Sequence, residues 1–430
     1  MMGCDADTPL KKSINTCVSL GTGMQEKGLV DFFEKFVSQK SLFRNKAVLQ
    51  SNFNPQQIPH REDQIKSLAT ILAPSLRGEK PSNVFIYGKT GTGKTLVAQH
   101  TVDQLAAVAK GREVPVVPIY LNCKMKKVAD TQYRLIAHIT RENFNENLPV
   151  TGLPTEEIYA AFLRAVDTKK QILILILDEI DQLMDKEGDD MLYNLTRINT
   201  ELKNAQISII GISNNANFIT MLDPRVKSSL SQEEMFFPPY NALQIQDILK
   251  QRAAEAFAPG AIVAGVVEKC AAFAARDHGD ARRAIDLLRV AAELAERSSV
   301  SKVTTAHLDQ AESKIETDRI FEILKTQPQQ YQAALYAIYS ICSKKKDQVF
   351  TGEVYDLYQG LCGKVGLRPL TQRRISDIVG ELDMLGIINA KVISKGRYGR
   401  TREISVSTTD ELTPQVLQAL SEELALAHDS

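Results

Sequence analysis

The feature that most constrains this chain is a glycine-rich segment that directly follows the apolar run at residues 84–87. The segment reads Gly-x-x-x-x-Gly-Lys-Thr, and its fixed positions are Gly88, Gly93, Lys94 and Thr95. Such a loop points its N–H groups at a phosphate, and the following helix turns its positive end toward the same anion. We expect Lys94 to contact the β- and γ-phosphates and the Thr95 hydroxyl to bind Mg²⁺. The expected nucleotide contacts are Gly88, Lys89, Thr90, Gly91, Thr92, Gly93, Lys94 and Thr95.

A second apolar run, at residues 172–177, ends in the acidic sequence Asp178-Glu179-Ile180-Asp181. An uninterrupted apolar run is typical of a strand that is buried on both faces of a parallel sheet. Ligands bind at the carboxyl ends of such strands. We therefore expect Asp178 to hold Mg²⁺, through water, and Glu179 to polarise an attacking water molecule. For Asp181 a helix N-cap is the preferred interpretation over a third site carboxylate.

Three further polar residues are candidates for the same site. Asn214 follows the apolar run at residues 207–212 and is placed to bind a γ-phosphate or the attacking water; the alternative is an ordinary turn residue. Arg282 opens a helical segment and is expected to reach the γ-phosphate, unless Arg283 does so instead. Arg225 is a candidate arginine finger for a neighbouring subunit, or else a surface arginine or one that contacts the lid. The candidate catalytic set is Lys94, Asp178, Glu179, Asn214, Arg282 and Arg225.

Composition excludes several classes of protein. The 430-residue chain has no net charge, so no global field attracts nucleic acid or membrane. Its six cysteines are scattered without C-x-x-C pairs, which suits a reducing compartment rather than a disulfide or zinc framework. No apolar run approaches the roughly 18 residues that a membrane span needs. We expect a cytoplasmic protein with no membrane partner.

The order of the elements predicts three folded regions. Strands that alternate with helices through residues 84–212, the last of these helices at 190–203, predict a parallel sheet covered by helices. Pro238-Pro239 precedes an all-helical region, and after Pro328 helices give way to two short strands, as in a winged helix. The expected divisions are a flexible tail (1–28), an α/β base (29–237), a helical lid (238–316), a winged helix (317–410) and a C-terminal helix or tail (411–430).

Positive charge is concentrated in the last of these folded regions. Nine basic residues lie between positions 364 and 402, opposed by three acidic ones. The amphipathic helix expected at 371–385, with Leu385 on its inner face, carries Arg373 and Arg374 near its start, where recognition helices meet DNA. The alternative is a solvated basic face on a protein-binding domain. The candidate DNA contacts are Arg368, Thr371, Arg373, Arg374, Lys395, Arg397, Tyr398 and Arg400.

Taken together, these stretches resemble the AAA+ superfamily, and within it the archaeal replication initiators. That family is related to the eukaryotic origin recognition complex and the cell-division-cycle helicase loader. The resemblance covers most of residues 29 to 410. It rests on the segments 58–62 (Ile-Pro-His-Arg-Glu), 87–95, 211–215, 222–230, 279–289 and 396–401.

The resemblance implies an ATP-dependent initiator that binds double-stranded origin DNA and helps to recruit or load the replicative helicase. It implies ATP or ADP and Mg²⁺ as cofactors, slow, switch-like hydrolysis, possible partner initiator subunits, and a nucleoid-associated archaeal protein. The loop before the helix at 61–72 would then contact the nucleotide through Ile58, His60 and Arg61. A clamp-loader-type ATPase and an NTP-gated winged-helix transcriptional regulator are the alternatives.

The resemblance also implies a helical insertion in the base that touches DNA. We place it in residues 124–155, where there is more helix than one strand–helix unit needs. Its candidate phosphate contacts are Lys124, Lys126, Lys127, Arg134 and Arg141.

Overall fold

The computed structural model describes residues 34, 37, 40–50, 53–124, 131–144, 153–183, 188, 190–215, 218–230, 232–276, 279–345, 348–394, 400–408 and 412–426. The expected tail at 1–28 lies outside these ranges, as does the wing tip at 395–399. The chain forms two compact units, Met1–Thr305 and Ala306–Ser430.

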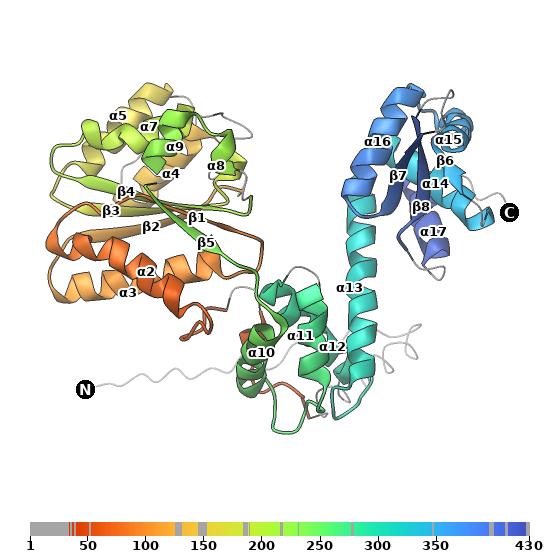
Figure 1. Cartoon of the computed structure of the whole chain (residues 1–430), viewed down its shortest axis with the longest axis horizontal. Coiled ribbons are helices and arrows are strands. Elements are labelled where there is room, and N and C mark those ends of the chain that lie inside the picture. The colour runs from red at the N-terminus through yellow and green to blue at the C-terminus, as the bar shows by residue number, and fades with distance from the viewer. Residues whose placement is uncertain are drawn as a thin grey trace, which may run out of the picture. The chain divides into compact units, whose positions relative to one another are not determined.

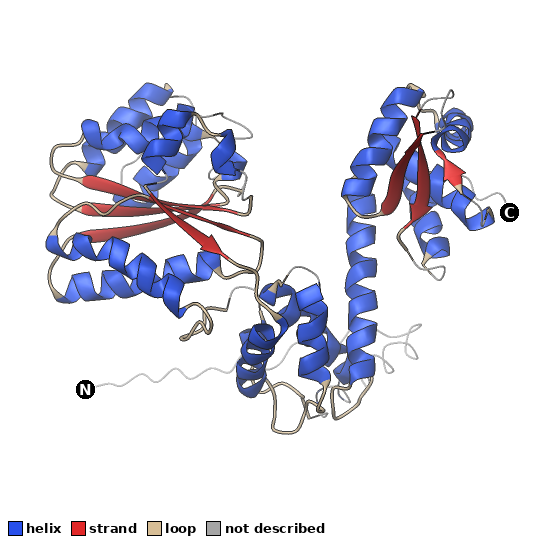
Figure 2. Ribbon diagram, in the orientation of Figure 1, coloured by secondary structure: helices blue, strands red, loops and turns tan. Residues whose placement is uncertain are grey.

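The first unit is built on a five-stranded sheet in the order β2-β3-β4-β1-β5, in which every pair of neighbours is parallel (Figure 2). Its strands are β1 (Val84–Gly88), β2 (Val116–Asn122), β3 (Ile172–Asp178), β4 (Gln206–Ser213) and β5 (Glu233–Phe237). Because the strands are parallel, all their carboxyl ends share one edge. The predicted phosphate loop and the Asp178-Glu179 pair therefore lie at the same edge of the sheet.

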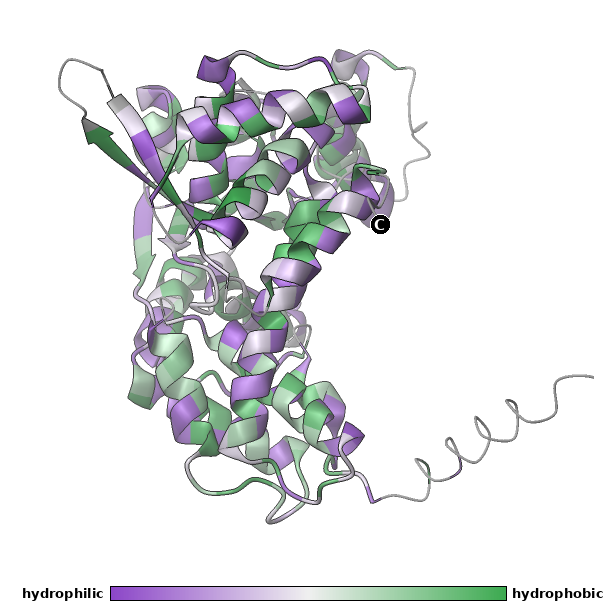
Figure 3. Cartoon of the chain, turned by 90° about the vertical axis from the view of Figure 1, so that its right-hand side faces the viewer, coloured by the Kyte–Doolittle hydropathy of each residue, from purple (hydrophilic) through white to green (hydrophobic). Residues whose placement is uncertain are grey.

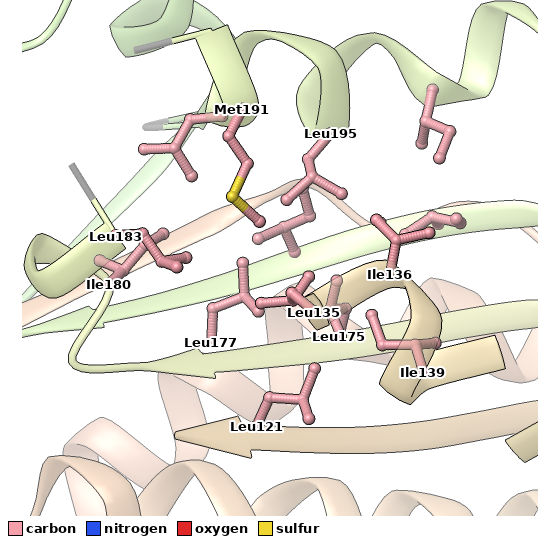
Figure 4. Packing of buried hydrophobic residues seen from close by; sticks show 14 of the residues in the cluster. Leu121, Leu135, Ile136, Ile139, Leu175, Leu177, Ile180, Leu183, Met191 and Leu195 are labelled. Atoms are coloured by element: carbon pink, nitrogen blue, oxygen red, sulfur yellow. The ribbon is translucent and has the colours of Figure 1, made fainter. Parts of the chain in front are cut away.

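Helices cover both faces of this sheet, as Figure 1 shows. On one side lie α2 (Glu62–Leu72) and α3 (Lys94–Gly111), and on the other α4 (Gln132–Phe144), α5 (Thr155–Val166), α7 (Asp190–Arg197), α8 (Phe218–Met221) and α9 (Pro224–Leu230). Figure 4 shows how Leu175 and Leu177 of β3 pack against α4 and α7 on the second side. Every residue of β3 is buried, which confirms the prediction made from its apolar run. Short 3₁₀ helices complete the unit: η1 (Lys46–Leu49), η2 (Ala73–Arg77) and η3 (Ile198–Thr200).

Two details of this unit differ from the sequence prediction. The helix expected at 190–203 ends at Arg197, because the Asn199 amide pairs with both backbone groups of Ile207 in β4 (2.8 and 2.7 Å) and draws the chain to the sheet. Strand β5 was not predicted at all. Only Met235 and Phe237 of its five residues are buried, so its sequence lacks the apolar run of a central strand.

An all-helical lid follows β5, as expected from its composition. It contains α10 (Ala242–Ala256), α11 (Val266–Arg276) and α12 (Ala281–Arg297). Asn241 forms a capping box with Gln244 at the start of α10. Asp280 caps α12 by accepting hydrogen bonds from the N–H groups of Arg282 and Arg283. Hydrophobic and hydrophilic residues alternate along the helices in Figure 3, as expected of elements with one buried face.

The second unit is a winged helix. After α13 (Thr305–Thr326) come α14 (Gln329–Lys344), β6 (Val349–Phe350), α15 (Thr351–Val365), α16 (Gln372–Met384), β7 (Ile388–Ser394), β8 (Arg400–Val406) and α17 (Thr413–Glu423). The strands form an antiparallel sheet in the order β6-β8-β7. Helix α17 packs on the same core through Val416 and Leu420. The prediction that Leu385 faces inward was wrong: α16 ends at Met384, and Leu385 is 36% exposed at its cap.

We predict that Asn83→Ala destabilises the first unit by about 2–4 kcal/mol. The buried Asn83 side chain donates to the Ser229 carbonyl (2.7 Å) and accepts from the Ile209 N–H (2.9 Å), so it joins the start of β1 to β4 and α9. Alanine leaves both buried partners unpaired. Urea unfolding followed by circular dichroism measures the effect. The control, Gln206→Ala, changes an exposed residue at the start of β4, and equal unfolding midpoints for the two variants would contradict the prediction.

Candidate functional site

The phosphate loop joins β1 to α3 and aims its lysine at the centre of the loop. The Lys94 ammonium donates to the carbonyl oxygens of Gly88 and Lys89, both at 2.8 Å. Its burial lowers the pKa of Lys94 to about 8, and a bound phosphate would favour the charged form. Gly88 must be glycine, because its φ is 152° and a Cβ there would lie 2.4 Å from the Phe237 carbonyl oxygen. The sequence therefore builds a narrow cationic cradle.

Asp178, at the end of β3, lies directly beside this loop. Its Oδ2 accepts hydrogen bonds from the Thr95 hydroxyl (2.8 Å) and the Tyr120 hydroxyl (3.0 Å), and its Oδ1 accepts from the Glu179 N–H (3.0 Å). Burial, with the charge of Asp178, raises the pKa of Tyr120, so this hydroxyl stays protonated as a donor. The Thr95 and Asp178 oxygens are hard ligands, which suits Mg²⁺.

Tyr120 was missed by sequence reasoning. The available signal was its place two residues before the end of β2, where Asn122 is in register with Asp178 on the neighbouring strand. Side chains two residues apart on a strand share one face. Tyr120 therefore points to the same side of the sheet as Asn122, which lies beside Asp178.

Glu179 follows Asp178 in a left-handed backbone conformation, with φ of 53°. A glutamate pays a conformational cost there, which suggests that its orientation matters. Its Oε2 lies 3.8 Å from the ammonium of Lys124, which is an exposed residue of the expected insertion. Asp181 accepts hydrogen bonds from the Ser213 hydroxyl (2.8 Å) and the Gln182 amide (3.3 Å), so it ties this turn to the end of β4.

One pocket of about 520 Å³ unites most of the predicted catalytic residues. Its walls include the loop, the ends of β2, β3 and β4, and the start of α12. The predicted residues that line it are Lys94, Thr95, Asp178, Glu179, Asn214 and Arg282. Of the two lid arginines considered, Arg282 lines this pocket and Arg283 does not.

The lid touches the phosphate loop directly. The Ala281 N–H at the start of α12 donates to the Gly91 carbonyl (3.3 Å), and a Cβ on Gly91 would collide with the Asp280 carboxylate. The pocket is therefore shared between base and lid.

Apolar side chains also line the pocket. Ile58 lines it, as expected, beside Leu49, Phe53, Ile248 and Arg252. The buried Arg252 guanidinium lies over the Phe53 ring, 4.6 Å from its centroid. Sequence reasoning missed Phe53 and Arg252, since neither belongs to a short motif.

His60 and Arg61 were expected to contact nucleotide, but the structure does not bring them to the pocket lining. His60 Nε2 lies 3.2 Å from Asp247 Oδ2 in α10. The buried Arg61 donates to the Thr92 carbonyl (2.9 Å) and the Pro238 carbonyl (2.6 Å), and its guanidinium lies 3.9 Å from the Tyr240 ring centroid. Its hydrogen-bonding capacity is thus directed to the backbone, and Arg61 joins the phosphate loop to the hinge between base and lid.

Arg225 does not reach the pocket of its own chain. Its side chain on α9 is 68% exposed and donates twice to the Asp223 carboxylate (3.1 Å each). The arginine therefore forms a surface ion pair within its own chain.

The predicted DNA contacts divide between two faces of α16. Arg374 donates to Glu381 Oε1 and to the Tyr331 hydroxyl, both at 3.1 Å, and so packs toward α14. Arg373 lies on another face, toward the wing strands. Thr371 caps α16, and Arg368 precedes it with its carbonyl bound to Gln330.

Other predicted contacts are only partly placed. Lys395, Arg397 and Tyr398, with Lys126 and Lys127 of the insertion, lie outside the described residues, and Arg400 is the first residue of β8. Arg134 and Arg141 lie on α4.

Among the helices that the structure describes, none has the length and apolar character to cross a membrane.

Family models match three successive parts of the chain. They are an AAA domain (residues 77–218), a Cdc6 AAA+ ATPase-type lid domain (246–313) and a CDC6 C-terminal winged helix domain (322–413). Each match coincides with the element order described above.

Whole-chain comparisons agree with these matches. The chain is 52% identical over 389 residues to the ORC1-type DNA replication protein of Thermococcus onnurineus, covering 90% of this chain and 93% of that one. It is 50% identical over 402 residues to that of Pyrococcus furiosus, covering 93% and 95%. The structure of the Aeropyrum pernix ORC1 protein in complex with DNA matches with a TM-score of 0.79 and 45% identity, covering 89% of this chain and 98% of that chain. The chain therefore belongs to the ORC1-type DNA replication proteins, the origin-recognition family of AAA+ ATPases.

Proposed function

We propose that this protein is an ATP-dependent replication initiator that binds double-stranded origin DNA and helps to recruit or load the replicative helicase. The observation that carries the proposal is the pocket that joins Lys94, Asp178 and Glu179 of the base to Arg282 of the lid. A winged helix with a concentration of basic residues follows in the same chain. The related Aeropyrum pernix ORC1 protein is known in complex with DNA.

Each polar residue of the pocket has a distinct role in this proposal. Lys94 and the loop N–H groups bind the phosphates of ATP, and Glu179 polarises the attacking water. Asn214 orients that water or the γ-phosphate, and Arg282 closes on the γ-phosphate from the lid. Thr95 and Asp178 would hold Mg²⁺, which when bound would neutralise negative charge on the phosphates.

ATP acts here as a switch more than as fuel. Since the pocket has walls on both base and lid, occupancy by ATP or ADP biases the arrangement of these two parts. Arg225 is 68% exposed on α9 and lies outside the pocket of its own chain, which supports a role as finger for a neighbouring initiator subunit. An isolated protomer would lack that arginine, so its hydrolysis should be slow.

The winged helix, the wing and the insertion supply the DNA contacts in this proposal. The geometry favours Arg373 over Arg374 as a base-reading residue of α16, since Arg374 is engaged by Glu381 and Tyr331. On the insertion, Lys124 is 71% exposed and thus accessible to a phosphate.

We predict that Lys94→Ala abolishes ATP binding, because it removes the ammonium from the centre of the loop. Glu179→Gln should bind ATP but hydrolyse it at least about 100-fold more slowly, because an amide is a poor base. Titration with a fluorescent ATP analogue and a phosphate-release assay measure the two effects. Glu157→Gln, at an exposed position on α5, is the control. Normal hydrolysis by Glu179→Gln would refute the assigned base.

We predict that Tyr120→Phe raises the Mg²⁺ concentration needed for half-maximal ATP binding by about tenfold or more. The change removes one hydrogen bond to the Asp178 carboxylate, and bonds to charged groups contribute about 1.5–3 kcal/mol. ATP affinity in EDTA should be unchanged. The control is Tyr159→Phe, whose buried hydroxyl has no partner among the described residues. An unchanged Mg²⁺ requirement would show that Tyr120 does not position Asp178.

The DNA-binding half of the proposal is tested by fluorescence anisotropy with the ATP-bound protein. A duplex that carries origin repeats should bind at least about tenfold more tightly than a scrambled duplex, since each wrong base pair costs about 1–3 kcal/mol. Equal affinity for the two duplexes, or preference for promoter DNA, would contradict an origin-binding function.

A further inference from the structure

A polar notch lies between α16 and the wing strands of the second unit. Its volume is about 520 Å³, and its lining comes from Thr351, Gln372, Arg373, Ser376, Val392, Thr401 and Arg402. Thr351 begins α15 and Gln372 begins α16, so two helix N-termini border the same space. N-terminal ends of helices favour anions.

Arg402 occupies this notch because of strand alternation. Ile404 of β8 is buried in the core, and Arg402, two residues earlier, lies on the same face of the strand. The side chains of β8 that face the core therefore form a row, and the next member of this row after Ile404 is Arg402. Val392, opposite Arg402 in the register of β7, is 55% exposed and lines the notch. Beyond the buried Ile404, this face of the sheet therefore carries a cation beside an exposed valine.

Helix α16 is shaped to receive this arginine. Arg373, Ser376 and Gly380 are spaced three and four residues apart, so they lie on one face of the helix. A Cβ on Gly380 would lie only 3.0 Å from an amino nitrogen of Arg402, which shows that the guanidinium lies against the helix at the glycine. The absence of a side chain at Gly380 makes room for the cation.

The two arginines of the notch have no acidic partner in the described part of the chain. Arg374 on the other face of α16 is paired with Glu381, whereas neither Arg373 nor Arg402 has an ion pair or hydrogen bond within the described residues. The hydroxyl of Thr351, a residue only 6% exposed, also lacks a partner there. Leaving the buried Thr351 hydroxyl unpaired is costly, and an anion in the notch would accept its hydrogen bond and pair with Arg402.

We propose that this notch binds one phosphate of the DNA backbone, with Arg402 as its principal cation and Gln372 as a second donor. The proposal rests on the proposed DNA-binding function and assigns a contact that the sequence analysis did not. A backbone phosphate carries no sequence information. Arg402 therefore fixes the position of α16 on the duplex rather than its choice of bases.

The test compares Arg402→Met with the wild-type full chain on origin and scrambled duplexes, from 50 to 200 mM salt. Methionine keeps an apolar stem against α16 and removes the charge. We expect a several-fold loss of affinity for both duplexes and a salt slope smaller by about 0.9, so that the deficit shrinks about threefold over this range. Arg402→Lys should retain the slope. Lys364→Met is the charge-matched control: it lies 13 residues along α15 from Thr351, roughly 20 Å away.

The results of this experiment distinguish a failure of the proposed phosphate site from a failure of the proposed DNA-binding function. A wild-type slope for Arg402→Met, or a loss of affinity confined to the origin duplex, would overturn the phosphate site. If wild-type protein bound neither duplex, the proposed DNA-binding function itself would fail. Should Arg402→Met not fold, Gln372→Ala carries the test, since this exposed residue costs little stability; it should weaken binding to both duplexes, and unchanged affinity would overturn the proposal.

Discussion

The phosphate loop is held in place by contacts that come from outside it, and the rest of the first unit depends on them. Arg61 ties the Thr92 carbonyl to the Pro238 carbonyl at the hinge and stacks on Tyr240. On the lid side, the Ala281 N–H meets the Gly91 carbonyl. Gly279 is required at the same hinge, because a Cβ there would lie 2.4 Å from the Tyr240 carbonyl oxygen. The loop, hinge and lid thus form one connected set of contacts.

The contacts between loop, hinge and lid offer a route by which a bound nucleotide could change the arrangement of base and lid. A phosphate that enters the loop changes the environment of Lys94, which in turn donates to two loop carbonyls. The same loop is bonded to the hinge through Arg61 and to α12 through Gly91. In the proposed switch, the coupling would run through hydrogen bonds and the Arg61–Tyr240 stacking that are present in the described residues, and it would require no long-range charge.

Much of the nucleotide site could be predicted from the sequence, because its residues stand next to apolar runs that mark the ends of strands. Lys94, Asp178 and Asn214 belong to this class. Tyr120 also stands near a strand end and was overlooked, whereas Phe53 and Arg252 could not be found in this way, since they reach the pocket only through packing of distant segments. Arg61 was assigned to the nucleotide through the family resemblance of the segment at 58–62, of which only Ile58 and Pro59 line the pocket. Its guanidinium points to backbone carbonyls instead, which spacing alone could not reveal. Strand β5 was missed because an edge strand buries only alternate residues.

The central claim is that nucleotide binding, hinge and lid are one coupled unit. Hydrogen–deuterium exchange with mass spectrometry tests it most directly, with Glu179→Gln protein in the presence and absence of ATP. The account predicts that ATP slows amide exchange in the phosphate loop, in the hinge at 238–241 and at the start of α12. Protection confined to the phosphate loop, with unchanged exchange in the hinge and lid, would contradict it.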